Sequence, residues 1–67
     1  MQISVRNKLA GTVKEVRLGA VMAEIIIQVG DNQVVSAITK DAAEDLALKV
    51  GDKVIALIKS TSVMVQK

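Results

Sequence analysis

Two short polar clusters lie near opposite ends of this 67-residue chain. They are Ser4-Val5-Arg6-Asn7 and Lys59-Ser60-Thr61-Ser62, and each joins a cation to hydroxyl groups at the edge of a strand-like run. Ser4 and Arg6 are two residues apart, so on a strand both side chains project to the same face. A cation beside hydroxyls and backbone N–H groups can hold an oxyanion by several hydrogen bonds. Each cluster also has a simpler interpretation. Ser4 and Arg6 are ordinary on a solvated edge strand, Lys59 can pack its stem along a strand end, and Ser60-Thr61-Ser62 can be a plain loop.

Two further segments present backbone N–H groups that suit an anion. Thr39 to Ala42 lies where a strand is expected to turn into a helix, and helix N-termini attract anions. Thr39 also fits the simpler role of a helix cap. The small-residue turn Gly19-Ala20-Val21 can expose consecutive N–H groups as a nest, although the same sequence suits an ordinary turn.

The residue types that are missing argue against catalysis. The chain has no His, Cys, Trp, Tyr or Phe, so its Ser and Thr hydroxyls have no histidine base, and no thiolate or imidazole metal ligand is present. Its seven acidic residues are scattered and suggest neither a carboxylate dyad nor a cage for a hard cation. No Gly-rich nucleotide loop occurs. We therefore expect a binding protein without direct protein–metal ligands rather than an enzyme.

Size and composition predict self-association. A single domain of 67 residues buries a modest core and usually needs a disulfide, a metal or a partner. Because disulfides are excluded and 51% of the residues are apolar, a homo-oligomer is the expected source of further burial. The net charge of +2 is too small for a duplex-binding protein. Without a spanning segment or a signal pattern, we expect a soluble cytoplasmic protein with neither nucleic acid nor membrane as partner.

Most of the chain has the Val- and Ile-rich composition of strands. Gly11 suggests a bulge, Gly30-Asp31-Asn32 is a hairpin signal, and Ile25-Ile26-Ile27 is apolar on both faces. One helix is predicted from Lys40 or Asp41 to Leu48, because Ala43, Leu46, Ala47 and Val50 have helical spacing; Asp41 and Glu44 resemble a capping box. The predicted strands are residues 3–8, 9–18, 21–29, 33–39, 53–59 and 62–66.

These elements predict an all-β fold, a small OB-like Greek-key barrel of five to six strands with one short helix. Residues 1–67 form its single domain. Strands that are apolar on both faces need cover on both sides, and the barrel interior supplies only one. A neighbouring subunit is the natural cover for the other.

The order of these segments resembles a known family. Ser4-Val5-Arg6-Asn7-Lys8-Leu9-Ala10-Gly11 is followed by Ala37-Ile38-Thr39, Leu48-Lys49-Val50-Gly51-Asp52-Lys53-Val54 and Ile58-Lys59-Ser60-Thr61. Together these segments resemble the molbindins, small Mop-type molybdate-binding proteins with a TOBE-like domain. The resemblance extends over essentially the whole chain.

The resemblance implies a hexamer with oxyanion sites between subunits. The main site would use Ser4, the Val5 backbone and Arg6 of one chain, completed by Thr39, Ala42, Lys59 and Ser60, partly from a neighbour. Some relatives carry a serine at the position of Ala42, where this chain offers only a backbone N–H. A second oxyanion site would lie near Gly19, Ala20 and Val21.

The resemblance and the donor-only residues together predict binding of molybdate or tungstate for storage and homeostasis. Both anions are tetrahedral dianions that only accept hydrogen bonds, whereas phosphate is partly protonated near pH 7 and needs an acceptor. Sulfate must be rejected by size. Two other functions remain open: a single-stranded nucleic-acid-binding module, which usually needs aromatic platforms, and a purely structural oligomerisation module.

Overall fold

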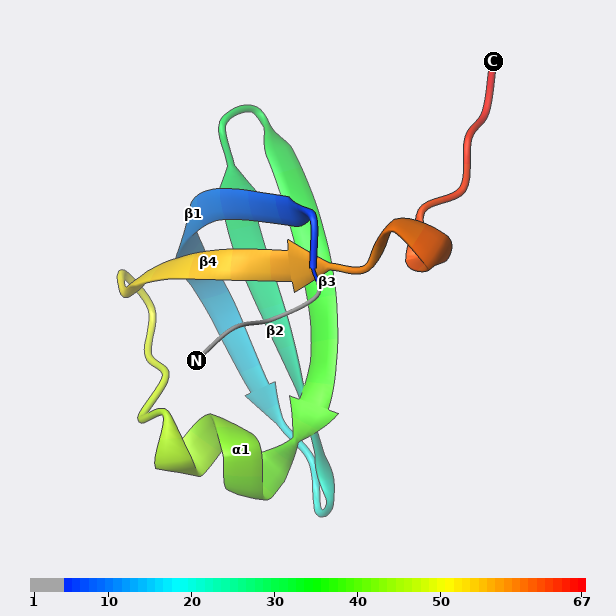
Figure 1. The fold of residues 1–67 in the computed structure, drawn as a ribbon. Helices are drawn as coiled ribbons and strands as arrows, with labels where there is room; N and C mark the ends of the chain where they lie inside the picture. The colour runs from blue at the N-terminus through cyan, green and yellow to red at the C-terminus, as the bar shows by residue number, and fades with distance from the viewer. Residues whose placement is uncertain (1–4) are drawn as a thin grey trace.

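The computed structural model describes residues 5–67 and shows a mostly β protein. Its four strands form one antiparallel sheet in the order β3-β2-β1-β4 (Figure 1). One short helix links β3 to β4. The elements are β1 (Asn7–Leu18), β2 (Met22–Val29), β3 (Asn32–Thr39), α1 (Lys40–Asp45), β4 (Lys53–Ile58) and a 3-10 helix η1 (Ser60–Ser62).

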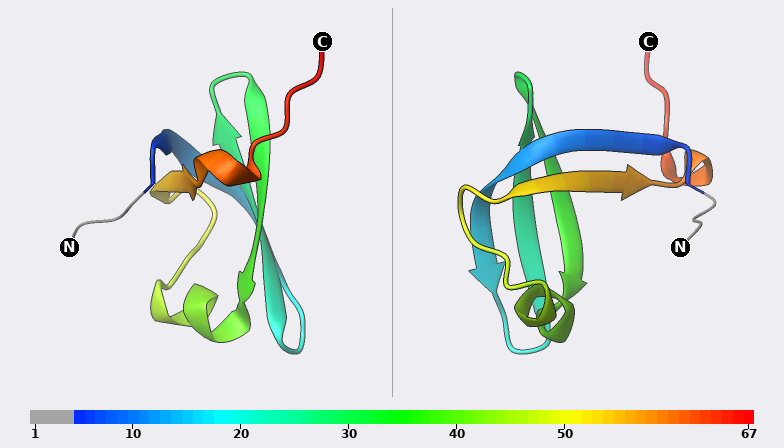
Figure 2. Two further views of the ribbon diagram at one scale, coloured as in Figure 1. Left: turned by 45° about the vertical axis from the view of Figure 1, so that its right-hand side comes forward. Right: turned by 60° about the vertical axis from the view of Figure 1, so that its left-hand side comes forward.

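Strand β1 is shared between two partners, which curls the sheet. Its first half pairs with β4 and its second half with β2, and the register to β2 shifts between Val13 and Glu15. The bulge therefore lies at this point rather than at Gly11, where it was predicted. Gly11 instead permits a close approach, because a Cβ there would lie 2.6 Å from the Gln28 carbonyl oxygen. The bend turns β1 and β4 across β2 and β3 (Figure 2).

The predicted hairpin between β2 and β3 is confirmed. Val29 pairs with Asn32, so Gly30 and Asp31 form a two-residue turn. Gly30 has a φ of +57°, a left-handed conformation that glycine adopts without a steric cost. Since this turn fixes the register of the hairpin, alternate residues of β2 face the interior.

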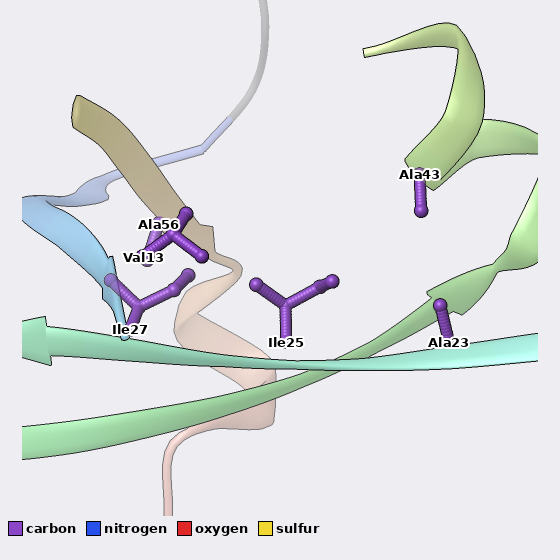
Figure 3. Close-up of a cluster of buried hydrophobic side chains, with 6 residues drawn as sticks. All are labelled: Val13, Ala23, Ile25, Ile27, Ala43 and Ala56. Atoms are coloured by element: carbon purple, nitrogen blue, oxygen red, sulfur yellow. The ribbon is translucent and has the colours of Figure 1, made fainter. Parts of the chain in front are cut away.

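The buried core is small and consists of aliphatic side chains from the sheet and the helix (Figure 3). Ile25 and Ile27 point inward from β2, while Ile26 is half-buried on the opposite face beside Val35. The apolar outer face predicted for this strand is therefore present. The buried residues are Val13, Ala23, Ile25, Ile27, Ala43 and Ala56.

Helix α1 is shorter than predicted. It ends at Asp45, and Ala47 has a φ of +50°. The Ala47 N–H donates to Glu44 O and the Leu48 N–H donates to Ala43 O, which is a Schellman ending. Only Ala43 of the predicted apolar helix face is buried, because the left-handed turn takes the residues that follow off the helix axis.

Four strands are described rather than five or six. The predicted strands 3–8 and 9–18 form one continuous β1 from Asn7, and Ile3 and Ser4 lie outside the described residues. Residues 62–66 do not form the predicted last strand, because Ser62 belongs to η1 and no partner strand lies beside the segment that follows. Within residues 5–67 the sheet is open, with β3 and β4 as its edges. No helix in this part of the chain is long and apolar enough to cross a membrane.

Candidate functional site

The two cationic clusters meet at one end of the β1–β4 pair. Asn7 pairs with Ile58, and the Asn7 side-chain amide donates to the Ile58 carbonyl oxygen over 3.1 Å. Arg6 directly precedes β1 and Lys59 directly follows β4, so this closing pair sets them at the same end of the sheet (Figure 1). The structure thus joins residues that lie more than fifty positions apart in the chain. Ser4, which the sequence places in the same cluster, lies outside the described residues.

This end of the sheet carries positive charge that remains unneutralised. Within residues 5–67, neither Arg6 nor Lys59 forms an ion pair. Both side chains are exposed, as is Ser60. The segments that carry these residues add no carboxylate of their own, because residues 1–13 and 53–67 contain five basic residues and no acidic one. A dianion from solution would therefore not have to displace a carboxylate that is already paired with Arg6 or Lys59.

Backbone donors accompany the two cations. Lys59 has an extended backbone and precedes the single turn of η1, in which the Ser62 N–H donates to the Lys59 carbonyl oxygen over 2.9 Å. The first N–H groups of such a turn have no partner within it. The Ser60 N–H and hydroxyl therefore follow Lys59 directly, on the same short segment.

Thr39 is a helix cap in this structure. Its Oγ1 accepts a hydrogen bond from the Ala42 N–H over 3.1 Å. Because the N-cap is Thr39, the residue three positions later is Ala42, and the capping box predicted for Asp41 and Glu44 does not form. The Thr39 hydroxyl hydrogen is still free to donate outward, since a hydroxyl both donates and accepts. The Ala42 N–H is already engaged.

One chain does not bring all the predicted site residues together. Thr39 pairs with Met22, and Leu18 pairs with Ala23, so the start of α1 lies by the last residue of β1. Arg6 lies before the first residue of the same strand. The Arg6–Lys59 group and the Thr39–Ala42 group therefore occupy opposite ends of β1, and a site using both needs two chains.

The turn of residues 19–21 lies beside the Thr39–Ala42 group. The Lys40 N–H donates to the Val21 carbonyl oxygen over 2.7 Å, which joins this turn to the start of α1. The Gly19 N–H is used inside the turn, where it donates to Met22 O over 2.8 Å. No backbone bond of the Ala20 or Val21 N–H occurs within residues 5–67, so these two are the donors the turn can offer.

Asn7 belongs to the first polar cluster, but the sequence does not indicate its structural role at the candidate site. Its amide fastens the end of β1 to β4 and so sets the position of Arg6 relative to Lys59. No local pattern signals this role, because the partner carbonyl is 51 residues away.

Comparisons with known proteins agree with the fold and the order of these segments. The TOBE domain family matches residues 3–65. The chain is 46% identical over 66 residues to molybdenum-pterin-binding protein 3 of Clostridium pasteurianum, covering 97% of each chain. It belongs to the TOBE domain family and, within it, to the small Mop-type molbindins. The resemblance seen in the sequence is thereby confirmed.

Two solved molbindin structures extend the comparison. A molybdate-binding protein from Sporomusa ovata is 51% identical, with a TM-score of 0.95 over 100% of both chains. The cytoplasmic molybdate-binding protein ModG, solved with molybdate bound, is 38% identical, with a TM-score of 0.88 over 96% of this chain and 46% of ModG. The molbindin fold of these proteins is therefore the fold of this chain.

Proposed function

We propose that this protein binds molybdate or tungstate, without catalysing a reaction, and stores or buffers the oxyanion in the cytoplasm. The observation that carries the proposal is the placement of Arg6, Lys59 and Ser60 at one end of the sheet, on segments that contain no acidic residue. The two solved relatives support the ligand, since both are molybdate-binding proteins, and ModG supports the location.

The proposed site spans two chains. One chain supplies Ser4, the Val5 backbone and Arg6 together with Lys59 and Ser60. The neighbour supplies Thr39 and Ala42, because these lie at the other end of β1 within a single chain. The Ala42 N–H would have to divide its bond between Thr39 Oγ1 and the anion, so the Thr39 hydroxyl is the stronger donor on that side. A second oxyanion site is proposed at residues 19–21.

Because the proposed site residues are divided between two chains, the protein must self-associate to complete the site. We propose that it forms the hexamer that its resemblance to the molbindins implies. Residues 1–67 of each chain would form a single domain, an OB-like Greek-key barrel. The barrel would close only when the chains assemble. The apolar residues that remain exposed on β4, Ile55 and Leu57, are surface that a subunit contact would bury. Ligand held between chains would stabilise that assembly by mass action.

The chemistry of the donor set favours an acceptor-only dianion. Guanidinium, ammonium and N–H groups offer only donors, and hydroxyls can orient as donors. Molybdate and tungstate satisfy every such donor at neutral pH. Hydrogen phosphate carries a proton of its own, which would find no carboxylate near Arg6 or Lys59 to accept it. Sulfate lacks this proton, so its rejection rests on the size of the completed cavity.

Titration calorimetry with single variants tests the site. A charge-assisted hydrogen bond contributes about 1.5–3 kcal/mol, so Arg6→Ala and Lys59→Ala should each weaken molybdate binding by roughly 10- to 150-fold. Lys14→Ala is the matched control, because Lys14 is an exposed cation at the bulge of β1, away from the proposed site. Unchanged affinity in both site variants would refute the assignment. Native mass spectrometry with molybdate and with sulfate gives the stoichiometry, and an oligomer that binds neither would indicate a structural role.

A further inference from the structure

The outward face of the β1–β4 pair gathers cations at the end that carries the proposed site. Exposure alternates along β4 and continues past its end, so Leu57 and Lys59 are exposed while Ile58 between them is half-buried. Lys59 has an extended backbone, with a φ of −64° and a ψ of 141°. Its side chain therefore leaves the backbone on the same face as that of Leu57.

Lys8 lies on this face beside Lys59. Its partner across the pair is Leu57, and residues that face each other on two strands project to the same side of the sheet. Lys59 is two residues beyond Leu57, so it is the diagonal neighbour of Lys8, at a backbone separation of about 7–8 Å. Lys8 is itself exposed. It therefore adds a third cation next to Arg6 and Lys59.

No carboxylate compensates this third charge. Within residues 5–67, Lys8 takes part in no ion pair. The residue opposite it is apolar, and the strand segments on both sides contain no Asp or Glu. Like charges at this spacing repel each other, whereas an oxyanion bound beside Lys59 would be attracted by both ammonium groups.

We infer that Lys8 acts on the proposed oxyanion site through its charge alone, and that it favours doubly charged oxyanions over singly charged ones. The inference rests on the proposed function and names a specificity residue for the same site. Lys8 lies inside the Asn7–Ile58 closing pair, whereas Arg6, Lys59 and Ser60 lie outside it, so these three are the ones placed to donate hydrogen bonds.

The preference follows from Coulomb's law. The attraction between two ions scales with the product of their charges, so Lys8 attracts a dianion about twice as strongly as a monoanion of the same shape. Molybdate and perrhenate are such a pair, because both are tetrahedral and accept hydrogen bonds without donating any. Over about 8 Å of water-like dielectric, one positive charge should strengthen dianion binding about four-fold and monoanion binding about two-fold at low ionic strength.

A charge ladder at residue 8, measured by titration calorimetry at low salt, tests the inference. Lys8→Gln should weaken molybdate binding about four-fold and perrhenate binding about two-fold, and Lys8→Glu should weaken molybdate binding by about four-fold again. Lys8→Arg should bind both anions as the parent does. At about 0.5 M salt, all variants should bind molybdate within about two-fold of the parent, because the charges are then screened.

Lys14→Gln is the matched control. It removes the same charge from an exposed position on the same strand, at the bulge and six residues further from the site. Over about 20 Å its effect on molybdate binding should stay below about 1.5-fold. Equal melting temperatures for the variants show that the fold is unchanged.

Two results would overturn the inference while leaving molybdate binding by the parent intact. One is parent affinity in Lys8→Glu. The other is a loss in Lys8→Gln that persists at high salt or is equal for both anions, since that indicates a contact rather than a charge. If perrhenate binds too weakly to titrate, the two equal steps of the molybdate ladder and their disappearance at high salt decide. A parent protein that binds neither anion would refute the proposed function, and this inference with it.

Discussion

Adding one methyl group at Gly11 should destabilise the protein. The Cβ of Gly11→Ala would lie 2.6 Å from Gln28 O and 2.7 Å from a methyl carbon of Ile27, against the 3.4 Å at which ordinary contact begins. The Ile27 side chain can rotate, but the Gln28 carbonyl belongs to the β2 backbone. Relief therefore requires β1 to move away from β2 beside the Thr12–Gln28 pair.

The size of the effect follows from two opposing contributions. Overpacking of this kind costs about 1–3 kcal/mol, whereas replacing glycine by alanine gains about 0.4–1 kcal/mol from the unfolded chain. At the midpoints of the two ranges the net loss is about 1.3 kcal/mol, which lowers the Tm of a domain of this size by roughly 5–10 °C. Because the chain has no aromatic residue, far-UV circular dichroism at fixed protein concentration is the suitable assay.

A variant at Gly30 controls for the side chain itself. A Cβ at Gly30 meets no atom within 4 Å, and asparagine tolerates the left-handed conformation found there. Gly30→Asn should therefore shift the Tm far less than Gly11→Ala. A Tm for Gly11→Ala equal to or above that of the parent would refute the steric reasoning.

Four further changes test other parts of the fold, each by thermal unfolding. Thr39→Ala removes the cap on the Ala42 N–H and should cost about 1 kcal/mol, whereas Thr39→Ser should keep most of it. Ala47→Gly should stabilise by about 0.5–1 kcal/mol, because glycine adopts the φ of +50° without the cost that alanine bears; a lower Tm would contradict this. Ile25→Ala leaves a cavity where a side chain that is 2% exposed had packed, and it should lower the free energy of unfolding by about 2–5 kcal/mol. Arg17→Ala breaks only exposed ion pairs and should change stability by less than about 1 kcal/mol.

The paired strands were predictable because their signals are local. Two Val- and Ile-rich runs with the hairpin signal Gly30-Asp31-Asn32 between them located β2 and β3 to within one residue of their observed ends. The same reasoning failed for residues 62–66, which have a strand-like composition but no partner in a single chain. The end of α1 was missed because the helical spacing of apolar residues continues beyond Ala47, whose backbone turns left-handed.

The candidate site was predictable in its residue types but not in its arrangement. Cations beside hydroxyls predicted Arg6, Lys59 and Ser60 as oxyanion donors, and the structure places all three at the same end of the sheet, while their role in binding stays a prediction. Thr39 lies at the other end of β1, and no spacing in the sequence reveals this, because the bend of β1 and its two partners set the distance. The roles of Thr39 and Ala42 in binding remain predictions.

The pairing of β1 with β4 also has a consequence for how the chain folds during synthesis. The bond between Asn7 and Ile58 joins residues 51 positions apart, so β1 cannot form this pairing until β4 has been synthesised. Loop closure over that length slows formation of this contact relative to the β2–β3 hairpin. A nascent chain would therefore hold its hairpin early and expose the free edge of β1 until β4 has left the ribosome. The cationic end of the sheet is then the last part of the protein to mature.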